Sequence, residues 1–354
     1  MAGGQGERFW PKSTASMPKH LLGFVRKKPM ISQTLERVSG LVPKKQIAII
    51  TNKKQFAKIK QNAKGVAAQN MIIEPFGRST AAAIGLAAAL LNKCYPEAVM
   101  VALPCDHVIQ DKKKFARILR CASEAASKSG GLVTLGINPR FAFTGYGYIK
   151  KGAAVRSIAG ERLYKVERFV EKPDKNTARK YVESGQYFWN SGIFIWKAQA
   201  ILDEMKKYMP ALYRSLGKIE KSCCTASFKN ILEKEYKKLK DISIDYGIME
   251  KTKKALVLAT DLKWDDIGSW DAMSSYGKKD QDGNIVVGDF KGIDAKNCVV
   301  VGEKNRLVAV IGIQDAIIVE SRNATLVCGK KRTQDVKALV HELKKDDRLA
   351  RYTR

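Results

Sequence analysis

The spacing of hydrophobic positions changes repeatedly over the first 140 residues, which predicts an alternation of helices and strands. Apolar residues that recur every three or four positions predict amphipathic helices. They do so at 30–41, 56–63 and 115–129. Short uninterrupted apolar runs predict strands. These runs lie at 46–50, 70–75, 98–104 and 131–137. Alternation of this kind is typical of a doubly wound, Rossmann-like α/β fold.

Two of the apolar segments support more specific predictions. The run AVMVALP at 98–104 contains no polar residue, so we expect a strand of a parallel sheet that is covered on both faces. The stretch 81–91 is apolar all round and carries no charge, which predicts a buried helix. Ser79 and Thr80 precede this helix and are expected to cap its N-terminus.

The pattern becomes less regular after about residue 143 and changes again near residue 280. Short strands at close spacing follow the turn signal Asp282-Gly283-Asn284 and predict a β-rich unit. A final helix is expected, capped by Thr333 and with an apolar stripe. The stripe consists of Val336, Leu339, Val340 and Leu343. We therefore predict two domains, an α/β domain at 1–278 with a mixed, mostly parallel sheet and a β-rich domain at 279–354.

Composition narrows the classes of function. The net charge is +29, from 64 Lys and Arg against 35 Asp and Glu, but the basic residues are spread in twos and threes along the whole chain. This spread argues against a nucleic-acid partner and favours anionic small molecules. The longest apolar runs are too short to cross a bilayer, and we expect no secretory signal. Seven scattered cysteines without a CxxC pair suit reduced thiols, so we expect a cytoplasmic protein.

A glycine-rich stretch, AGGQGERFWP at 2–11, is the first candidate for chemistry. Gly3, Gly4 and Gly6 allow backbone N–H groups to approach phosphate oxygens, and Arg8 adds a fixed positive fork. The stretch matches neither the P-loop nor the dinucleotide-binding pattern, and a plain glycine turn is the alternative. Lys19 follows soon after and would reach the same phosphates, although a solvated surface lysine is the alternative reading.

Two acidic positions are candidates for a metal site. Asp106 follows the predicted strand at 98–104, at the edge where open α/β sheets bind ligands. Asp265 and Asp266 lie in WDDIGSW and would add further carboxylates. Oxygen ligands of this kind, together with substrate phosphates, suit Mg²⁺. Turn or cap residues are the alternative reading for each of them.

A series of motifs runs through the chain from residue 2 to about 273. The motifs are AGGQGERFWP, PKHLL, EPFGRSTAAAIGLAA, LPCDHVI, LGINPRFAFTGYGYI, VERFVEKPD, YFWNSGIFIW, SIDYGIMEK and WDDIGSWDAM. In this order they resemble the mannose-1-phosphate guanylyltransferases, a branch of the sugar-phosphate nucleotidylyltransferases. The β-rich tail is similar to the C-terminal domain of that family. The resemblance implies a nucleotide-diphospho-sugar transferase fold and transfer of GMP from GTP to mannose 1-phosphate.

The same resemblance implies a role for each matching residue. Gly3, Gly4, Gly6, Arg8 and Lys19 would hold the GTP phosphates. Guanine and ribose would lie against Glu74, Pro75, Gly77, Arg78 and Thr80. Asp106 and Asp266 would hold Mg²⁺. The sugar would contact Gly147, Glu171, Asn190 and Asp245, and Lys172 would bind its phosphate.

No nucleophile or general base is needed for this chemistry, because the attacking sugar phosphate is already ionised. His107 would then orient its neighbours or pack as an ordinary loop histidine. Two alternatives stay open, namely another sugar 1-phosphate and nucleotide pair, or a catalytically weak nucleotide-sugar-binding regulatory homologue. The oligomeric state also stays open, with a homodimer among the options.

The sequence departs from the family pattern at two informative places. Ser79 replaces a usual asparagine, which puts the base contacts near that position in doubt. Family members also have an apolar strand before the glycine-rich stretch, and Met1 stands where that strand would be or just after it. Losing a central strand would expose the hydrogen-bonding edges of its neighbours. We therefore expect the natural chain to start a few codons upstream.

Overall fold

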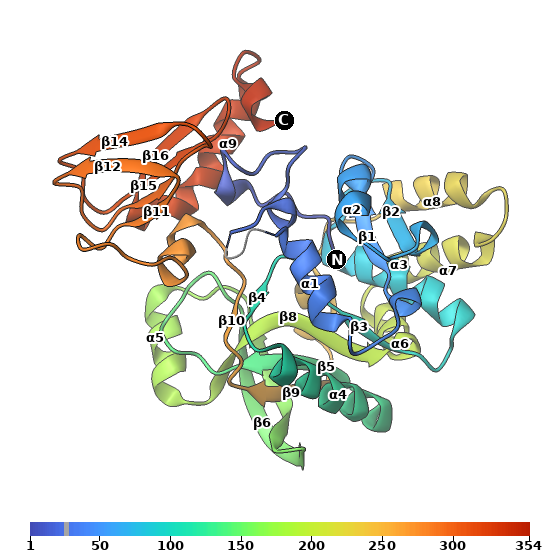
Figure 1. Cartoon of the computed structure of the whole chain (residues 1–354). Helices are drawn as coiled ribbons and strands as arrows, with labels where there is room; N and C mark the ends of the chain where they lie inside the picture. Colours follow the sequence, from blue (N-terminus) through green and yellow to red (C-terminus); the bar gives the residue numbers. More distant parts are fainter. Residues whose placement is uncertain (25–27) are drawn as a thin grey trace.

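A six-stranded mixed sheet is the largest element of the computed structural model, which describes residues 1–24 and 28–354. Its order is β3-β8-β5-β9-β7-β6, and the labelled strands β3, β8, β5, β9 and β6 lie in the lower half of Figure 1. In that order the strands are Val99–Ala102, Tyr187–Lys197, Leu132–Ile137, Ala255–Thr260, Glu161–Val170 and Tyr148–Ile158. β3, β5, β9 and β6 run in one direction, and β8 and β7 in the other. The predicted α/β fold with a mixed sheet is confirmed, but the sheet is not mostly parallel: β5 and β9 pair in parallel, and the other strand pairs of this sheet are antiparallel.

Part of the sheet closes into a ring. Because β6 pairs with β8 as well as with β7, strands β8, β5, β9, β7 and β6 form a closed ring. Gly136 of β5 lies on the inside of this ring. A Cβ atom there would come within 2.5 Å of Val257 Cγ2 and 2.9 Å of Phe188 Cβ. The absence of a side chain at this position therefore allows the strands to approach closely.

The prediction for 98–104 is wrong about the strand that pairs with this segment and about how deeply its side chains are buried. β3 pairs antiparallel with β8, its only strand partner in the described part of the chain. Both faces of β3 are covered as predicted, because Val99 and Val101 pack against one core and Met100 against the other, but the three side chains are only half-buried. The reason is that β3 ends the six-stranded sheet, so one of its edges has no neighbouring strand in that sheet.

Helices cover both faces of the sheet, and the alternation of side chains along β8 shows how. Ile193 and Ile195 share a core with helix α4 (Lys112–Ser129). Phe194 and Trp196 point the other way and share a core with the remaining large helices. These are α3 (Ser79–Cys94), α6 (Ala198–Tyr208), α7 (Pro210–Ser222) and α8 (Phe228–Lys237). The alanine-rich α3 is buried as predicted.

A smaller layer precedes β3. Strands β1 (Ile49–Asn52) and β2 (Met71–Glu74) pair in parallel, and α1 (Met30–Val38) and α2 (Phe56–Asn62) precede and separate them. β1 begins three residues later than the pattern predicts, because residues 44–46 form a 3₁₀ turn.

The first two residues lie between this layer and the segment after β3. The Ala2 N–H donates to the carbonyl of Ile50 at 2.8 Å, and Ala2 forms a parallel bridge with Thr51. The amino group of Met1 donates to the carbonyl of Leu103 at 2.7 Å. These contacts fix the start of the glycine-rich stretch. The expectation of an upstream start stays a prediction.

The C-terminal region forms short strands in two further sheets, followed by a helix. β11 (Ile285–Val287), β13 (Val299–Val301), β15 (Ala316–Glu320) and β16 (Thr325–Gly329) form one sheet, and β12 (Asp289–Ile293) and β14 (Leu307–Ile311) form the other. α9 (Val336–Lys345) follows. The predicted cap is wrong, because the Thr333 hydroxyl accepts no N–H of α9 and instead donates to Asp271 Oδ1 at 2.9 Å.

The C-terminal region packs directly against the glycine-rich stretch. Phe9 and Trp10 share one apolar core with Trp270, Val336 and Val340. Figure 1 shows α9 beside the N-terminal segment. The indole N–H of Trp10 donates to the carbonyl of Tyr352 at 2.9 Å. Residues that are hundreds of positions apart in the sequence thus form one packing unit.

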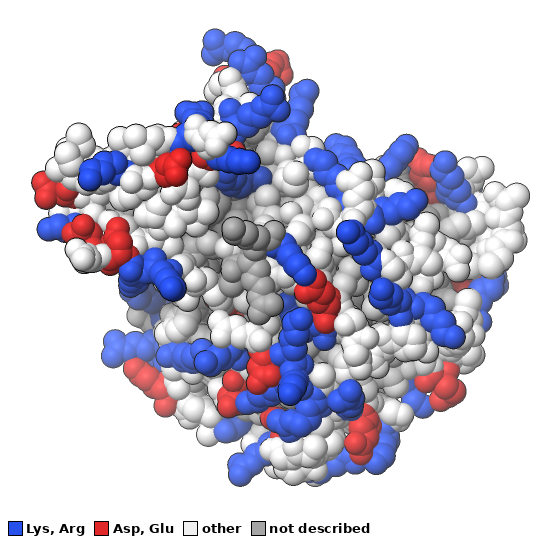
Figure 2. Space-filling view, in the orientation of Figure 1, with Lys and Arg blue, Asp and Glu red and all other residues white. Residues whose placement is uncertain are grey.

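Charged side chains are scattered over the face shown in Figure 2, and no continuous basic stripe crosses it. This view agrees with the spread of lysines along the sequence. Among the described residues, no helix is both long enough and apolar enough to span a membrane.

Candidate active site

The glycine-rich stretch turns back onto Lys19. Gly6 has a φ of +71°, in the left-handed region that favours glycine. A Cβ on Gly6 would lie 2.3 Å from the Cβ of Lys19. The Lys19 N–H also donates to the carbonyl of Gln5 at 3.2 Å. Glycine at position 6 is therefore required for the stretch to approach the buried lysine.

A cavity of about 440 Å³ opens beside this contact. It collects side chains and backbone from the N-terminal stretch, the segment after β3, the segment after β10 (Trp264–Asp265) and helix α9. The lining residues are Gln5, Gly6, Glu7, Arg8, Lys19, Asp106, Asp266, Gly268 and Lys337. The structure thus brings together four side chains that the sequence analysis selected, Arg8, Lys19, Asp106 and Asp266.

A short ladder explains why the two carboxylates meet. β4 (Val108–Ile109) pairs antiparallel with β10, with Val108 opposite Asp265. Asp106 precedes one strand and Asp266 follows the partner residue on the other. In an antiparallel pair these positions lie at the same end of the ladder.

Lys19 controls the electrostatics of the cavity. Its ammonium lies 2.9 Å from Asp106 Oδ2 and also donates to the backbone carbonyl of Asp266. Burial alone would raise the pKa of Asp106, but the charge and the hydrogen bond of Lys19, together with the charges of His107 and His20, outweigh it and hold that pKa well below its usual range. Burial raises the pKa of Asp266 to about 6, against the pull of Lys19 and with the help of the Asp265 and Asp106 charges.

Two buried polar atoms of residues that line the cavity lack hydrogen-bond partners within the described residues. They are Arg8 Nε and Asp266 Oδ1. Buried polar atoms are seldom left unsatisfied, so a ligand that accepts from Arg8 and binds at Asp266 is the natural complement. Two carboxylates in one cavity suit a magnesium ion that completes its coordination with phosphate oxygens and water. No group of three or more His, Cys, Asp or Glu suited to a metal occurs among the residues described.

A second group of selected residues gathers around Asn190. Its Nδ2 donates to Asp245 Oδ1 at 2.7 Å, and its backbone N–H donates to the carbonyl of Gly147 at 2.8 Å. A Cβ on Gly147 would lie 2.5 Å from Glu171 Oε2. Glu171 in turn pairs with Lys172 at 2.9 Å. The structure therefore brings together all five residues that the resemblance assigns to the sugar phosphate.

Asp245 is the most perturbed carboxyl of this second group. Burial raises its pKa to about 6, and the negative charge of Glu171 adds to the effect. The hydrogen bond from Asn190 and the charge of Lys172 act in the opposite direction.

The residues assigned to guanine and ribose are only partly free to bind a ligand. Glu74 lies next to the glycine-rich stretch, because a Cβ on Gly3 would be 3.5 Å from Glu74 Oε2. The buried Tyr236 donates to Glu74 Oε1 at 2.6 Å. Arg78 donates to the carbonyl of Lys237 at 3.1 Å. Pro75 and Gly77 lie between them, in the turn from β2 to α3.

The predicted cap at Ser79 and Thr80 is wrong. No side chain caps the first turn of α3, and Ser79 is inside the helix with a φ of +57°. The Thr80 hydroxyl accepts the N–H of Ile244 at 2.8 Å. This bond ties the start of α3 to the residue before Asp245. It therefore links the residues assigned to guanine and ribose with the group around Asn190.

His107 packs as a loop histidine. Its Nδ1 accepts the indole N–H of Trp264 at 3.1 Å, and the two rings meet edge to face. Burial lowers the pKa of His107 to about 4, so the ring is neutral at physiological pH. Lys337 also lines the first cavity, but it lies outside the motifs that the sequence analysis quotes, and no local signal marks it.

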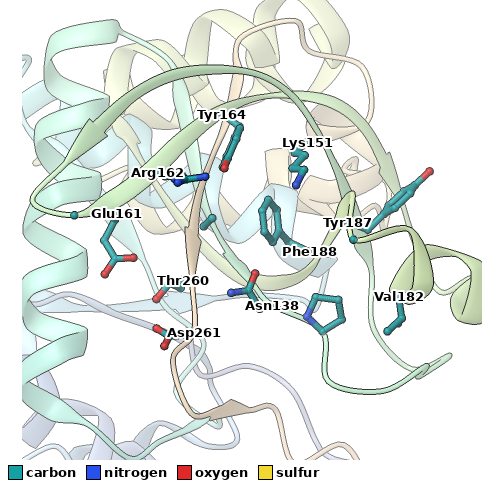
Figure 3. A pocket seen from close by; sticks show the side chains of 14 residues that line it. Asn138, Lys151, Glu161, Arg162, Tyr164, Val182, Tyr187, Phe188, Thr260 and Asp261 are labelled. Carbon is teal, nitrogen blue, oxygen red and sulfur yellow. The ribbon is translucent and has the colours of Figure 1, made fainter.

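A second cavity of about 510 Å³ lies beneath the β6–β7 hairpin (Figure 3). Lys151, Tyr164 and Phe188 project into its centre from the strands of the closed ring. None of the residues selected from the sequence lines it.

Comparison with known proteins agrees with this arrangement. Residues 1–283 match the nucleotidyl transferase family, and residues 288–343 match the MannoseP isomerase/GMP-like beta-helix domain. A mannose-1-phosphate guanylyltransferase of Klebsiella pneumoniae is 37% identical over 98% of this chain and 74% of its own length. A mannose-1-phosphate guanylyltransferase of Salmonella typhimurium, RfbM, is 38% identical over 98% of this chain and 72% of its own length.

A solved structure is similar over nearly the whole chain. The crystal structure described as a mannose-1-phosphate geranyltransferase from Thermus thermophilus superposes with a TM-score of 0.86 at 32% identity. It covers 97% of this chain and 98% of that one. The chain therefore belongs to the nucleotidyl transferase family and, within it, to the mannose-1-phosphate guanylyltransferases, which makes it an enzyme of the nucleotidyltransferase class.

Proposed function

We propose that the enzyme transfers GMP from GTP to α-D-mannose 1-phosphate and releases pyrophosphate, with GDP-mannose as the other product. The observation that carries this proposal is the first cavity, which places Arg8 and Lys19 beside Asp106 and Asp266. Its unsatisfied Arg8 Nε is a donor without an acceptor, as expected of a site built for phosphate oxygens. The names of the curated relatives supply the base and the sugar.

The residues of the chain would act by positioning and by charge. The backbone N–H groups at Gly3, Gly4 and Gly6, with Arg8, would hold the β- and γ-phosphates of GTP. Lys19 is buried, and its ion pair with Asp106 fixes the position of its ammonium group. This positive charge would stabilise the negative charge that develops on the leaving pyrophosphate. In-line attack by the sugar phosphate on the α-phosphorus then needs no protein base.

The metal ion in this proposal is Mg²⁺, which Asp106 and Asp266 would hold. When bound, it would neutralise charge on the phosphate oxygens. The role of the chain is to keep two carboxylates at one end of the β4–β10 ladder. The unsatisfied Asp266 Oδ1 supports this assignment.

The sugar phosphate would bind at the Asn190 group. Glu171, Asn190 and Asp245 offer carboxylate and amide groups to sugar hydroxyls, and Gly147 leaves room for the Glu171 carboxylate. The Lys172 side chain is 56% exposed, and Glu171 is its only bound partner among the described residues, so it has the freedom to turn toward a sugar phosphate. Glu74, Pro75, Gly77, Arg78 and Thr80 would frame the nucleoside.

We also propose a division at 278/279, because the strands on either side of it form separate sheets. The two domains would still share the core around Trp10 and Trp270. The reduced state of the described cysteines supports a cytoplasmic location.

The test is pyrophosphate release by the purified protein with Mg²⁺ and a panel of nucleoside triphosphates and sugar 1-phosphates. We expect release with GTP and mannose 1-phosphate and loss of release when EDTA removes the metal. Release with a different pair would establish the first alternative, another nucleotidylyltransferase. No release with any pair would favour the binding-only regulatory homologue.

Asp106→Asn tests the metal role within the same assay. We expect turnover to be lost. The melting temperature should fall as well, because the buried Lys19 loses its charged partner, so turnover is compared at a temperature at which circular dichroism shows the variant to be folded. Asp289→Asn, at an exposed position of β12, is the matched control and should leave turnover unchanged. Near-normal turnover of the Asp106→Asn variant would contradict the assignment.

A further inference from the structure

We propose that Lys337, on the C-terminal helix α9, is a ligand of the departing pyrophosphate, so that the region 279–354 completes the triphosphate site. This inference rests on the proposed function. It adds a substrate contact from outside the region that matches the nucleotidyl transferase family, which ends at residue 283.

The first observation is the place of Lys337. It lines the cavity together with Gly6, Arg8 and Lys19. Its side chain forms no ion pair and no hydrogen bond within residues 1–24 and 28–354. The other two lysines of α9 are paired, Lys344 with Glu7 and Lys345 with Glu342. The one lysine of the helix that faces the cavity is thus the one left without a partner among the described residues.

The second observation is that side-chain contacts fix the position of α9 relative to the glycine-rich stretch. Val336, the residue before Lys337, and Val340 are both 3% exposed and belong to the core that contains Phe9 and Trp10. Glu7 bonds to both Lys344 and His341 of the same helix. Lys337 is therefore presented by a packed helix rather than by a loose tail.

The pairing of the charges in the cavity narrows the choice of ligand. Of its three carboxylates, Asp106 is paired with Lys19, Glu7 is paired with Lys344, and Asp266 is the one proposed to hold the metal ion. Arg8 and Lys337 have no ionic partner in the described part of the chain. Two unpaired cations in one cavity favour a ligand with several negative charges. Pyrophosphate and the β,γ-phosphates of a nucleoside triphosphate have that charge.

The sugar phosphate is excluded as the partner of Lys337 by position. The residues assigned to it, Glu171, Lys172 and Asn190, do not line this cavity. Lys337 should therefore affect substrates that contain the β,γ-phosphates, and leave the others unchanged. In the forward direction this substrate is GTP, and in the reverse direction it is pyrophosphate.

Direct binding tests the inference without turnover. Isothermal titration of the full chain with inorganic pyrophosphate and Mg²⁺ is compared with titration with GMP. We expect Lys337→Ala to weaken pyrophosphate binding about ten- to a hundredfold, the loss typical of one charge-assisted contact, and to leave GMP binding unchanged. Lys337→Arg should restore most of the affinity. Lys345→Ala, an exposed lysine of the same helix, is the matched control.

Kinetics provide the second readout. Lys337→Ala should raise KM for GTP and, in the reverse reaction, for pyrophosphate, while KM for mannose 1-phosphate and for GDP-mannose stays the same. A uniform loss in all four, or an altered melting temperature with equal loss in GMP binding, would show a structural role and overturn the inference. Wild-type pyrophosphate affinity in Lys337→Ala would also overturn it.

Failure of the proposed function is distinguishable from these outcomes. A wild-type protein that binds pyrophosphate but makes no GDP-mannose would refute the proposed function and leave the Lys337 contact standing if Lys337→Ala weakens that binding. If the wild type makes GDP-mannose and Lys337→Ala binds pyrophosphate with equal affinity, the proposed function stands and the Lys337 contact is refuted.

Discussion

Gly6 and Lys19 are in such close contact that a Cβ on Gly6 would lie 2.3 Å from the Cβ of Lys19. This contact sets the distance between the glycine-rich stretch and the buried lysine beneath it. It also makes position 6 the most constrained glycine of the stretch, since Gly4 has no atom within 4 Å of such a Cβ.

Gly6→Ala should therefore destabilise the protein and reduce its activity together. The left-handed φ of +71° and the overlap with Lys19 add up to about 2–4 kcal/mol in the free energy of unfolding. Urea unfolding measures the first effect and pyrophosphate release the second. Gly40→Ala, at an open position with an ordinary φ, is the control. A Gly6→Ala variant as stable as Gly40→Ala would show that the stretch does not need this contact.

Gly147→Ala should separate activity from stability. The new methyl group would overlap with the end of the Glu171 side chain, which can turn away at a cost of about 1 kcal/mol or less, and would touch Asn190 Cβ at an ordinary contact distance of 3.4 Å. The displaced carboxylate would no longer reach the sugar, so KM for mannose 1-phosphate should rise about ten- to a hundredfold while KM for GTP changes little.

Gly136→Ala provides the contrast to that variant. Its methyl group would meet Phe188 and Val257 close to the backbone inside the closed ring, so unfolding should be the main effect. Unchanged KM for mannose 1-phosphate in Gly147→Ala would remove Glu171 from the sugar site.

Asp245→Asn should stabilise the protein at neutral pH. The folded-state pKa of Asp245 is raised from 3.8 to about 6, by burial first and by Glu171 second. The folded state then binds more protons than the unfolded state between about pH 4 and pH 6, so the wild type loses stability as the pH rises through that window. Two pKa units correspond to about 3 kcal/mol, and partial exposure of the side chain reduces the expected gain to about 1–2 kcal/mol.

The measurement is urea unfolding of the wild type and Asp245→Asn at pH 4 and at pH 7.5. The gain should appear at pH 7.5 and vanish at pH 4, where the carboxyl is largely protonated in the folded state. The charged groups around Asp245 are Glu171 and Lys172, and Asn190 donates to it. An equal gain at both pH values would contradict the electrostatic explanation.

Tyr236→Phe should destabilise the protein by about 1–3 kcal/mol at pH 7. The substitution removes the hydroxyl that donates to Glu74 and leaves a buried carboxyl without this donor. Because burial already raises the pKa of Glu74, the loss should shrink at acidic pH, where the carboxyl is neutral. Tyr95→Phe, at a position 65% exposed, is the control for thermal unfolding. A pH-independent loss in Tyr236→Phe would point to packing rather than to the hydrogen bond.

Local signals in the sequence predict much of the fold and the candidate site. The spacing of apolar residues is sufficient for α1, α4 and β5, and the motifs single out Arg8, Lys19, Asp106 and Asp266, which do share one cavity. These features depend on residues that are close together in the chain or that follow a strand end.

The features that the sequence does not predict depend on long-range contacts. The position of β3 at the end of the sheet depends on how β8 inserts beside it. Thr80 and Thr333 carry cap-like residue types, yet their hydroxyl partners, Ile244 and Asp271, come from distant segments. No motif in the sequence around Lys337 marks it as a site residue. Its place in the cavity follows from the packing of α9 against Phe9 and Trp10.

The joint core of the chain's two ends has a consequence for how the protein is made. Trp10 is bonded to the carbonyl of Tyr352, and Ala15 to that of Thr353. Ribosomes release the glycine-rich stretch first and Tyr352 hundreds of codons later, so these contacts form only after the C-terminal region has been made. The packing around the glycine-rich stretch is therefore among the last parts of the fold to be completed during translation.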